Sequence, residues 1–168
     1  MKVYGFIFTL CFFSIHLFAN DKVNKSDIGN VLNTFHQAAA DANQDLYFSL
    51  LDEQAIFLGT DGSERWNKQE FAKFVKPYFS KGQGWLYKPG QRNITLVAQS
   101  NSNEQLAFFD ELLENNNYGQ CRGSGVLRLT STGWKILQYN LSIPVPNGIA
   151  NDVVETIRSY QQNKPSNN

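Results

Sequence analysis

Cysteine is scarce in this 168-residue chain, which has two copies. Cys11 lies in an apolar run at the N-terminus, so the rest of the chain keeps only Cys121 and cannot form a disulfide within itself. A lone cysteine of this kind is more often buried and inert than paired with another chain. The fold must therefore be stabilised by packing rather than by covalent cross-links.

Histidine is equally rare, and outside the N-terminal run it is limited to His36. One histidine cannot build a metal site, and no other cluster of metal ligands appears. We therefore expect no metal and no cofactor, and we interpret His36 as a residue on a helix surface. The sequence also lacks a glycine-rich phosphate loop, a GxSxG elbow and a Cys/His nucleophile pair.

An excess of charge of either sign is also missing, since fifteen Lys and Arg balance fifteen Asp and Glu. Acids and bases are interspersed along the chain, so no basic stripe is available for nucleic acid. We expect no nucleic-acid partner.

The first 19 residues, MKVYGFIFTLCFFSIHLFA, have the layout of a secretory signal peptide. Their apolar run is slightly short for a membrane span and is interrupted by Ser14 and His16, although a retained anchor is the alternative. We predict cleavage after Ala19, export to a bacterial periplasm and no stable membrane insertion afterwards. The domain would cover residues 20–160, followed by a disordered polar tail over 161–168.

Helical patterns come first in the remaining chain. An apolar face with three- and four-residue spacing follows Ser26, which we expect to cap the first helix; its members are Ile28, Val31, Leu32, Phe35, Ala38, Ala39 and Ala42. Residues 44–52 indicate a short second helix and residues 55–60 a strand. Asn67 can cap a third helix, which Pro77 ends or kinks.

Strand patterns dominate the second half of the chain. They cover residues 85–88, 93–98, 105–113, 119–130 and 134–143, with turns at 101–103, 115–117 and 131–133. A closing helix over 150–160 would turn Val153, Val154 and Ile157 inward. This order predicts an α+β fold with one bent antiparallel sheet and helices on a single face. A sheet curved in this way has an open mouth in which a ligand can lie.

Several separated segments resemble one known family. FHQAAADANQDLYFSLLDEQAIFLGTDGSERW, FAKFVKPYF, FFDELLENNNYGQCRGSGVL and GWKILQYNLSIPVPN are similar to the SnoaL-like branch of the nuclear transport factor 2 (NTF2-like) superfamily, to which ketosteroid isomerase belongs. The resemblance implies a cone, with N-terminal helices in a strongly curved antiparallel sheet, a C-terminal helix and frequent dimerisation through the sheet. It does not imply one reaction, because the superfamily contains isomerases, cyclases, dehydratases and scaffolds.

The stretch GTDGSERW, residues 59–66, joins the first strand to the third helix. Glu64 and Arg65 are adjacent, so they should point to opposite sides. Trp66 precedes the Asn67 cap and can pack onto the helix as a hydrophobic staple. The stretch is either a structural loop that closes the cone or a rim that contributes Glu64 and Trp66 to a pocket.

Two consecutive acids, Asp110 and Glu111, lie in a strand that is otherwise apolar. One of them must face the helix-covered side, where an apolar cavity would raise its pKa and make it a catalytic general base or neutral donor. Alternatively, one acid pairs with an arginine and the other is solvated. A matching base on the early segments is missing, because Asp41, Asp45 and Asp52 lie in polar stretches that suggest solvent.

Arg122 is flanked by small residues and suits a carboxylate on the protein or on a ligand. Strict alternation from Leu127 turns Arg122 to the outer face, where it would serve a dimer contact. A bulge at Gly123 or Gly125 would turn it into the pocket instead. Both alternatives are open.

The predicted pocket contains aromatic and charged side chains: Phe57, Glu64, Trp66, Trp85, Asp110, Glu111, Arg122 and Tyr139. The leading hypothesis is an exported SnoaL-like protein of unassigned activity that binds a small, partly apolar molecule. One alternative is an isomerase, cyclase or dehydratase type of enzyme that needs no cofactor and uses a raised-pKa carboxylate. The other is a homodimeric interaction protein without a ligand.

Overall fold

Six strands form one sheet in the order β2-β1-β6-β5-β4-β3. The computed structural model describes residues 24–97 and 104–163, so the predicted signal peptide, the turn at 101–103 and most of the predicted tail lie outside the described residues. The strands are β1 (Leu51–Leu58), β2 (Arg65–Asn67), β3 (Lys88–Val97), β4 (Leu106–Asn115), β5 (Gly119–Thr130) and β6 (Gly133–Ser142). The helices are α1 (Lys25–Ala40), α2 (Gln44–Ser49), α3 (Lys68–Phe79), the short 3-10 helix η1 (Asn147–Ile149) and α4 (Ala150–Gln162).

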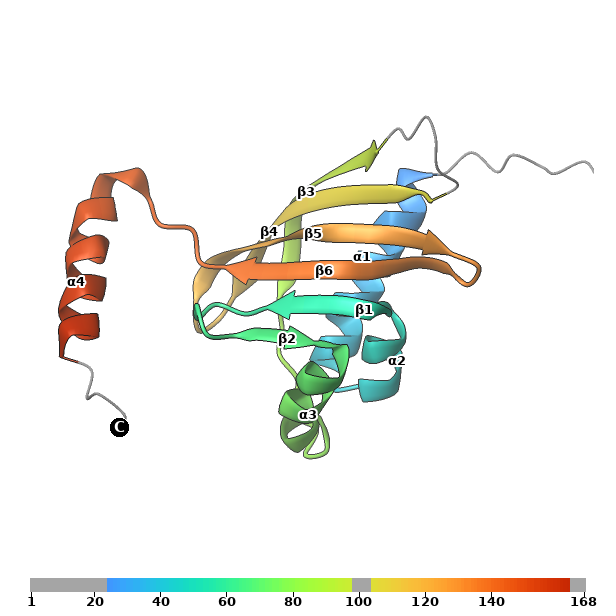
Figure 1. The fold of residues 1–168 in the computed structure, drawn as a ribbon, viewed down its shortest axis with the longest axis horizontal. Helices are drawn as coiled ribbons and strands as arrows, with labels where there is room; N and C mark the ends of the chain where they lie inside the picture. Colours follow the sequence, from blue (N-terminus) through green and yellow to red (C-terminus); the bar gives the residue numbers. More distant parts are fainter. Residues whose placement is uncertain (1–23, 98–103, 164–168) are drawn as a thin grey trace, which may run out of the picture.

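Helices α1, α2 and α3 lie on the same side of the curved sheet, and the apolar core fills the space between them (Figure 1). Neighbouring strands are antiparallel except for β1 and β6, which run parallel and bring the first strand beside the last. The predicted α+β cone is confirmed. The parallel pair was not predicted.

Helix α1 buries one face, as its spacing predicts, but its cap differs from the prediction. The side chain of Asn24, not Ser26, caps the helix by accepting a hydrogen bond from the Ser26 amide at 3.0 Å. Ile28 and Leu32 are fully buried, and the next position on that face, His36, is buried with 6% exposure. The expectation of a surface histidine is wrong, because position 36 follows Leu32 by four residues.

Helix α3 begins as predicted at Asn67. The Asn67 side chain accepts from the Glu70 amide and Glu70 accepts from the Asn67 amide, both at 2.9 Å, which completes a capping box. Trp66 packs on Phe71 with ring centroids 5.6 Å apart, so the predicted staple is present. Pro77 lies in the last turn, and the helix ends two residues later at Phe79.

The strands of the second half alternate between an inner face under the helices and an outer face. In β4 the inner residues are Ala107, Phe109, Glu111 and Leu113, and Glu111 is the one charged side chain among them. The β5–β6 hairpin turns as predicted, with Gly133 at φ 100°. Strand β1, which pairs with β6, starts at Leu51, earlier than predicted. Helix α2 is therefore shorter than expected.

Helix α4 lies apart from the sheet and contacts η1 rather than the core (Figure 1). Val154 is 42% and Ile157 48% exposed, and no residue of α4 is buried. The prediction that its apolar side faces inward is therefore wrong. The helix also continues to Gln162, past the predicted domain end at residue 160. Within the described ranges, no helix combines the length and hydropathy required to cross a membrane.

Candidate ligand-binding pocket

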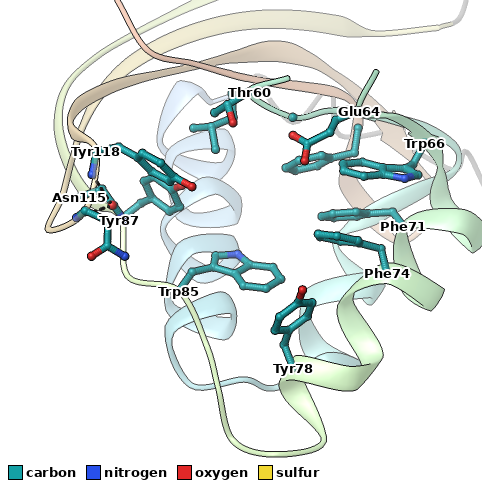
Figure 2. Close-up of a pocket in the computed structure, with 14 residues that line it drawn as sticks. Thr60, Glu64, Trp66, Phe71, Phe74, Tyr78, Trp85, Tyr87, Asn115 and Tyr118 are labelled. Atoms are coloured by element: carbon teal, nitrogen blue, oxygen red, sulfur yellow. Dashed lines mark hydrogen bonds between the residues drawn. The ribbon is translucent and has the colours of Figure 1, made fainter. Parts of the chain in front are cut away.

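A cavity of about 400 Å³ opens between α3 and the turn that joins β4 to β5 (Figure 2). Eight of its fourteen lining residues are aromatic and one, Glu64, is charged. The full set is Phe57, Gly59, Thr60, Glu64, Trp66, Phe71, Phe74, Tyr78, Trp85, Tyr87, Asn115, Asn117, Tyr118 and Leu141. The volume and the mainly aromatic lining are typical of small-molecule sites.

Stacked rings form one wall of the cavity. Trp66 stacks on Phe74 at 4.7 Å between centroids, and Phe57 stacks on Phe71 at 3.9 Å. These rings come from β1, β2 and α3. The wall is rigid because α3 is capped at Asn67 and its rings pack on one another.

Tyrosines form the opposite wall, with Trp85 between the two walls (Figure 2). The amide of Trp85 donates to the Ala39 carbonyl at 3.2 Å, which ties this residue to the end of α1. Trp85 lies in an irregular segment before β3 rather than in the predicted strand over 85–88. Burial, together with the nearby Cys121, Tyr118 and Glu64, raises the pKa of Tyr87 to about 12. Tyr87 is therefore a neutral hydrogen-bonding group at physiological pH.

Glu64 points into the space between the walls (Figure 2). Its Oε2 accepts a hydrogen bond from the Asp61 amide at 3.2 Å, so the tight turn fixes the direction of the side chain. Arg65 points the other way and lines a shallow groove of about 310 Å³ on the outer face of the sheet. The two neighbours therefore face opposite sides, as their adjacency predicts.

The second acidic site, Glu111, is fully buried beneath α1 and does not line the cavity. His36 Nε2 lies 2.6 Å from its Oε1, and the Tyr139 hydroxyl donates to the same oxygen at 3.2 Å. Arg92 Nε donates to Oε2 at 2.7 Å. Asp110, on the outer face, is exposed and accepts from Asn93 Nδ2 at 2.9 Å.

The surroundings of Glu111 decide its ionisation. Burial alone would raise the pKa of this carboxyl, but the hydrogen bonds and electrostatic attraction of His36 and Arg92 outweigh burial and hold it below the ordinary value of 4.5. Burial and the adjacent Glu111 raise the pKa of Tyr139 well above its ordinary value. The cluster is thus an ionised carboxylate with its donors in place, and the expectation of a raised pKa is wrong for Glu111.

Tyr139 separates the buried cluster from the cavity. Its ring stacks on Phe57 at 5.4 Å, and Phe57 in turn lines the cavity. Tyr139 itself is 3% exposed and belongs to the core. A molecule in the cavity would therefore touch the aromatic wall, with Glu111 lying behind it.

Arg122 is exposed on the outer face, because β5 alternates without interruption and no bulge occurs at Gly123 or Gly125. The register shift lies in β6, between the pairs Val126–Gln138 and Leu127–Ile136. Gly123 and Gly125 of β5 lie on the inner face of the sheet, where neighbouring atoms leave no room for a larger side chain. A Cβ atom at Gly123 would collide with the Tyr139 hydroxyl and meet Glu111 Oε1 at 3.0 Å.

Of the predicted pocket residues, Phe57, Glu64, Trp66 and Trp85 line the cavity, whereas Asp110, Glu111, Arg122 and Tyr139 do not. Sequence reasoning missed Phe71, Phe74, Tyr78 and Tyr118 as wall residues, although Phe71 and Phe74 follow the Asn67 cap on one helix face. Cys121 is fully buried, as expected of an inert thiol, and burial raises its pKa.

Two carboxylates that are buried form ion pairs. The alternative that one of the two consecutive acids pairs with an arginine is met by Glu111 and Arg92, whereas the pair of Asp52 with Arg128 was missed. Arg92 shares the parity of Ile94 and Leu96 along β3, which indicates that its side chain points inward to Glu111. Asp52 was expected in solvent but is 5% exposed and accepts two hydrogen bonds from Arg128. Burial opposes ionisation there, but Arg128 and the Gln54 amide lower the pKa of Asp52.

The family follows from comparison with known proteins. The model of the SnoaL-like domain matches residues 28–146, which is most of the chain. This protein belongs to the SnoaL-like domain family. No curated protein matches the sequence significantly.

Solved structures agree on the fold at low identity. An NTF2-like protein of unknown function from Pseudomonas putida has a TM-score of 0.55 at 12% identity, covering 73% of this chain and 87% of its own. An NTF2-like protein with a cystatin-like fold from Novosphingobium aromaticivorans scores 0.54 at 11%, covering 77% and 88%. A Nostoc punctiforme protein of unknown function with a cystatin-like fold scores 0.53 at 13%, covering 71% and 90%.

Proposed function

We propose that this protein is a small-molecule-binding module that holds a partly apolar molecule between aromatic walls. The observation that carries the proposal is the cavity of about 400 Å³, lined by eight aromatic side chains and a single carboxylate. A hydrophobic core would close such a space, because unfilled apolar volume destabilises a protein. Rings held apart around an open volume therefore favour a ligand.

The walls are prearranged, which favours binding further. The α3 capping box, the stack of Trp66 on Phe74 and the bond from the Trp85 amide to Ala39 fix rings from three segments. A prearranged site loses little conformational entropy when a ligand enters. The polar groups at the mouth would orient the molecule.

Nothing in the geometry favours the enzyme alternative at Glu111. That carboxylate is enclosed by His36, Arg92 and Tyr139, and its pKa is lowered rather than raised. A general base needs a substrate proton within hydrogen-bond reach. The aromatic layer of Phe57 and Tyr139 lies between Glu111 and the cavity.

A fluorescent probe tests the proposal. N-phenyl-1-naphthylamine is neutral and apolar and brightens in a dry site, so we expect saturable binding of one probe per chain. Asn117→Trp would plug the mouth, while Asn151→Trp, on exposed α4, is the matched control. We expect the plug to weaken binding at least about tenfold and the control to leave it unchanged. Equal binding to all three proteins, or binding to none, would overturn the proposal.

We propose a homodimer through the outer sheet face as a second role. The shallow groove there is partly apolar, with Ile56, Leu58, Val126 and Leu137 along it, and Phe108 is half exposed on the same face. Exposed apolar residues in a group favour a protein contact. Val126→Glu should shift sedimentation velocity toward the monomer, whereas Glu155→Gln should not. A wild-type monomer at high concentration would rule this role out.

Export is the remaining part of the proposal. The N-terminal apolar run and the small residue at Ala19 support it. Expression of the full chain in a bacterium, followed by fractionation and N-terminal sequencing, should yield a periplasmic protein that begins at Asn20. A cytoplasmic chain that still begins at Met1 would contradict it.

A further inference from the structure

The side chains that line the cavity carry negative charge and no positive charge. Its fourteen lining residues include one carboxylate, Glu64, and no lysine, arginine or histidine. Among the residues that the structure describes, no cation forms an ion pair with Glu64; the ion pairs there involve Glu53, Asp52, Glu104 and Glu111. Glu64 accepts a hydrogen bond from the Asp61 amide. The carboxylate therefore keeps acceptor capacity directed into the cavity.

The aromatic walls add to this negative potential. An aromatic ring carries negative charge on its faces, and tryptophan attracts cations most strongly. Trp66 and Phe74 stack on one another, so those two faces are turned to each other rather than to the cavity. Trp85, Tyr87 and Tyr118 lie on the other sides of the cavity, belong to no stacked pair among the described residues, and can turn a ring face toward a ligand (Figure 2).

From this arrangement we infer that the cavity binds an organic cation: a substituted ammonium or amidinium group that carries an apolar or aromatic part. The inference rests on the proposed binding function and names its ligand class. A cation placed beside Glu64 gains the ion pair and the unstacked ring faces of Trp85, Tyr87 and Tyr118, and partial exclusion of water strengthens both.

Other ligand classes fit less well. An anion would meet the Glu64 carboxylate with no positive side chain to offset the repulsion. A neutral hydrocarbon would fill the volume but would cover the half-buried carboxylate without a counter-charge. A bare inorganic cation would leave most of the roughly 400 Å³ unfilled. The site thus selects charge and apolar bulk together.

Three probes of similar size separate these classes. Benzyltrimethylammonium is the cation, neopentylbenzene is its neutral isostere and phenylacetate is the anion. Calorimetric titration, with quenching of Trp66 and Trp85 fluorescence as a second readout, gives an affinity for each. We expect the cation to bind at least about tenfold more tightly than the neutral isostere. The anion should bind more weakly than either.

Substitution of glutamate by glutamine tests whether the preference for the cation comes from the charge of Glu64. Glu64→Gln keeps the size and an acceptor for the Asp61 amide but removes the charge. We expect it to lose the cation's advantage of about tenfold while binding the neutral isostere as the wild type does. Glu155→Gln, on exposed α4, removes the same charge away from the cavity and should change neither affinity.

The results distinguish the organic-cation inference from the proposed binding function. A cation preference that disappears in Glu64→Gln and persists in Glu155→Gln supports the inference. If the neutral isostere binds at least as well as the cation, or the preference survives Glu64→Gln, the inference is overturned while the binding function stands. If none of the probes binds, N-phenyl-1-naphthylamine included, the binding function fails as well.

Discussion

Two glutamates in this protein occupy opposite environments. Glu111 is fully buried and its two oxygens contact His36, Tyr139 and Arg92. Glu64 lies at a cavity wall and accepts a hydrogen bond from a backbone amide of its own turn. The same type of side chain thus belongs to the core in one place and lines an open cavity in the other. The difference lies in the partners supplied, which only the three-dimensional structure reveals.

Removal of the buried charge should have the largest effect. Glu111→Gln leaves Arg92 and His36 without their common anion, so we expect a loss of about 3–5 kcal/mol in the free energy of unfolding. Urea unfolding followed by circular dichroism measures it. Asp110→Asn, on the same strand but exposed, is the control and should change stability by less than about 0.5 kcal/mol. Equal losses in both variants would contradict the central role of Glu111.

Steric crowding of the same cluster should cost less. Gly123→Ala places a methyl group against the Tyr139 hydroxyl and Glu111 Oε1, so we expect a loss of about 1–3 kcal/mol. Gly62→Ala is the matched control, since nothing lies within 4 Å of its added Cβ. Thermal unfolding compares the two. If the two alanine variants unfold at the same temperature, the packing around Glu111 accommodates the added methyl group.

Acid should weaken the protein through the same carboxylate. The pKa of Glu111 and that of Asp52 lie below the ordinary values of 4.5 and 3.8, so both acids stabilise the folded state above these values. That stabilisation is lost as pH falls through the folded-state pKa values. We expect the urea midpoint to decline below about pH 4.5, and to decline less steeply in Glu111→Gln. Parallel declines in wild type and variant would assign the acid sensitivity to other groups.

Neutralisation of the cavity glutamate should have the smallest effect on stability. Glu64→Gln keeps the turn and breaks no ion pair among the described residues, so we expect a change of less than about 0.5 kcal/mol. The same urea titration measures it beside the binding experiment. A loss comparable to that of Glu111→Gln would mean that Glu64 stabilises the loop rather than serving a ligand.

Local signals predicted much of the fold. Strand β5 matches its predicted bounds of residues 119–130, because Gly119 and the 131–133 turn mark both ends. Asn67 caps α3 as its position before an apolar helical face indicates. The family resemblance predicted the cone, but neither the resemblance nor a local pattern predicted the parallel pairing of β1 with β6.

The candidate site was less predictable because it depends on which residues meet across elements. The sequence left two orientations for Arg122, and the absence of a bulge in β5 at Gly123 or Gly125 decides between them. His36 lies on a helix face whose spacing was readable, but it was assigned to the helix surface. Arg92 lies one residue before the predicted strand over 93–98, so its orientation was not predicted. Glu64 and Trp66 line the cavity, which agrees with one of the two alternatives for residues 59–66, that of a rim contributing both side chains.

The parallel contact between β1 and β6 has a consequence for the order of folding. Leu51 and Ile136 are register partners although much of the chain separates them. Contacts between distant residues form slowly, because a long loop must close before they can stabilise anything. The centre of the sheet therefore cannot assemble until the last strand has been synthesised. A growing chain that stops before Gly133 leaves one edge of β1 without its neighbour, so we expect truncated products to aggregate or to be degraded.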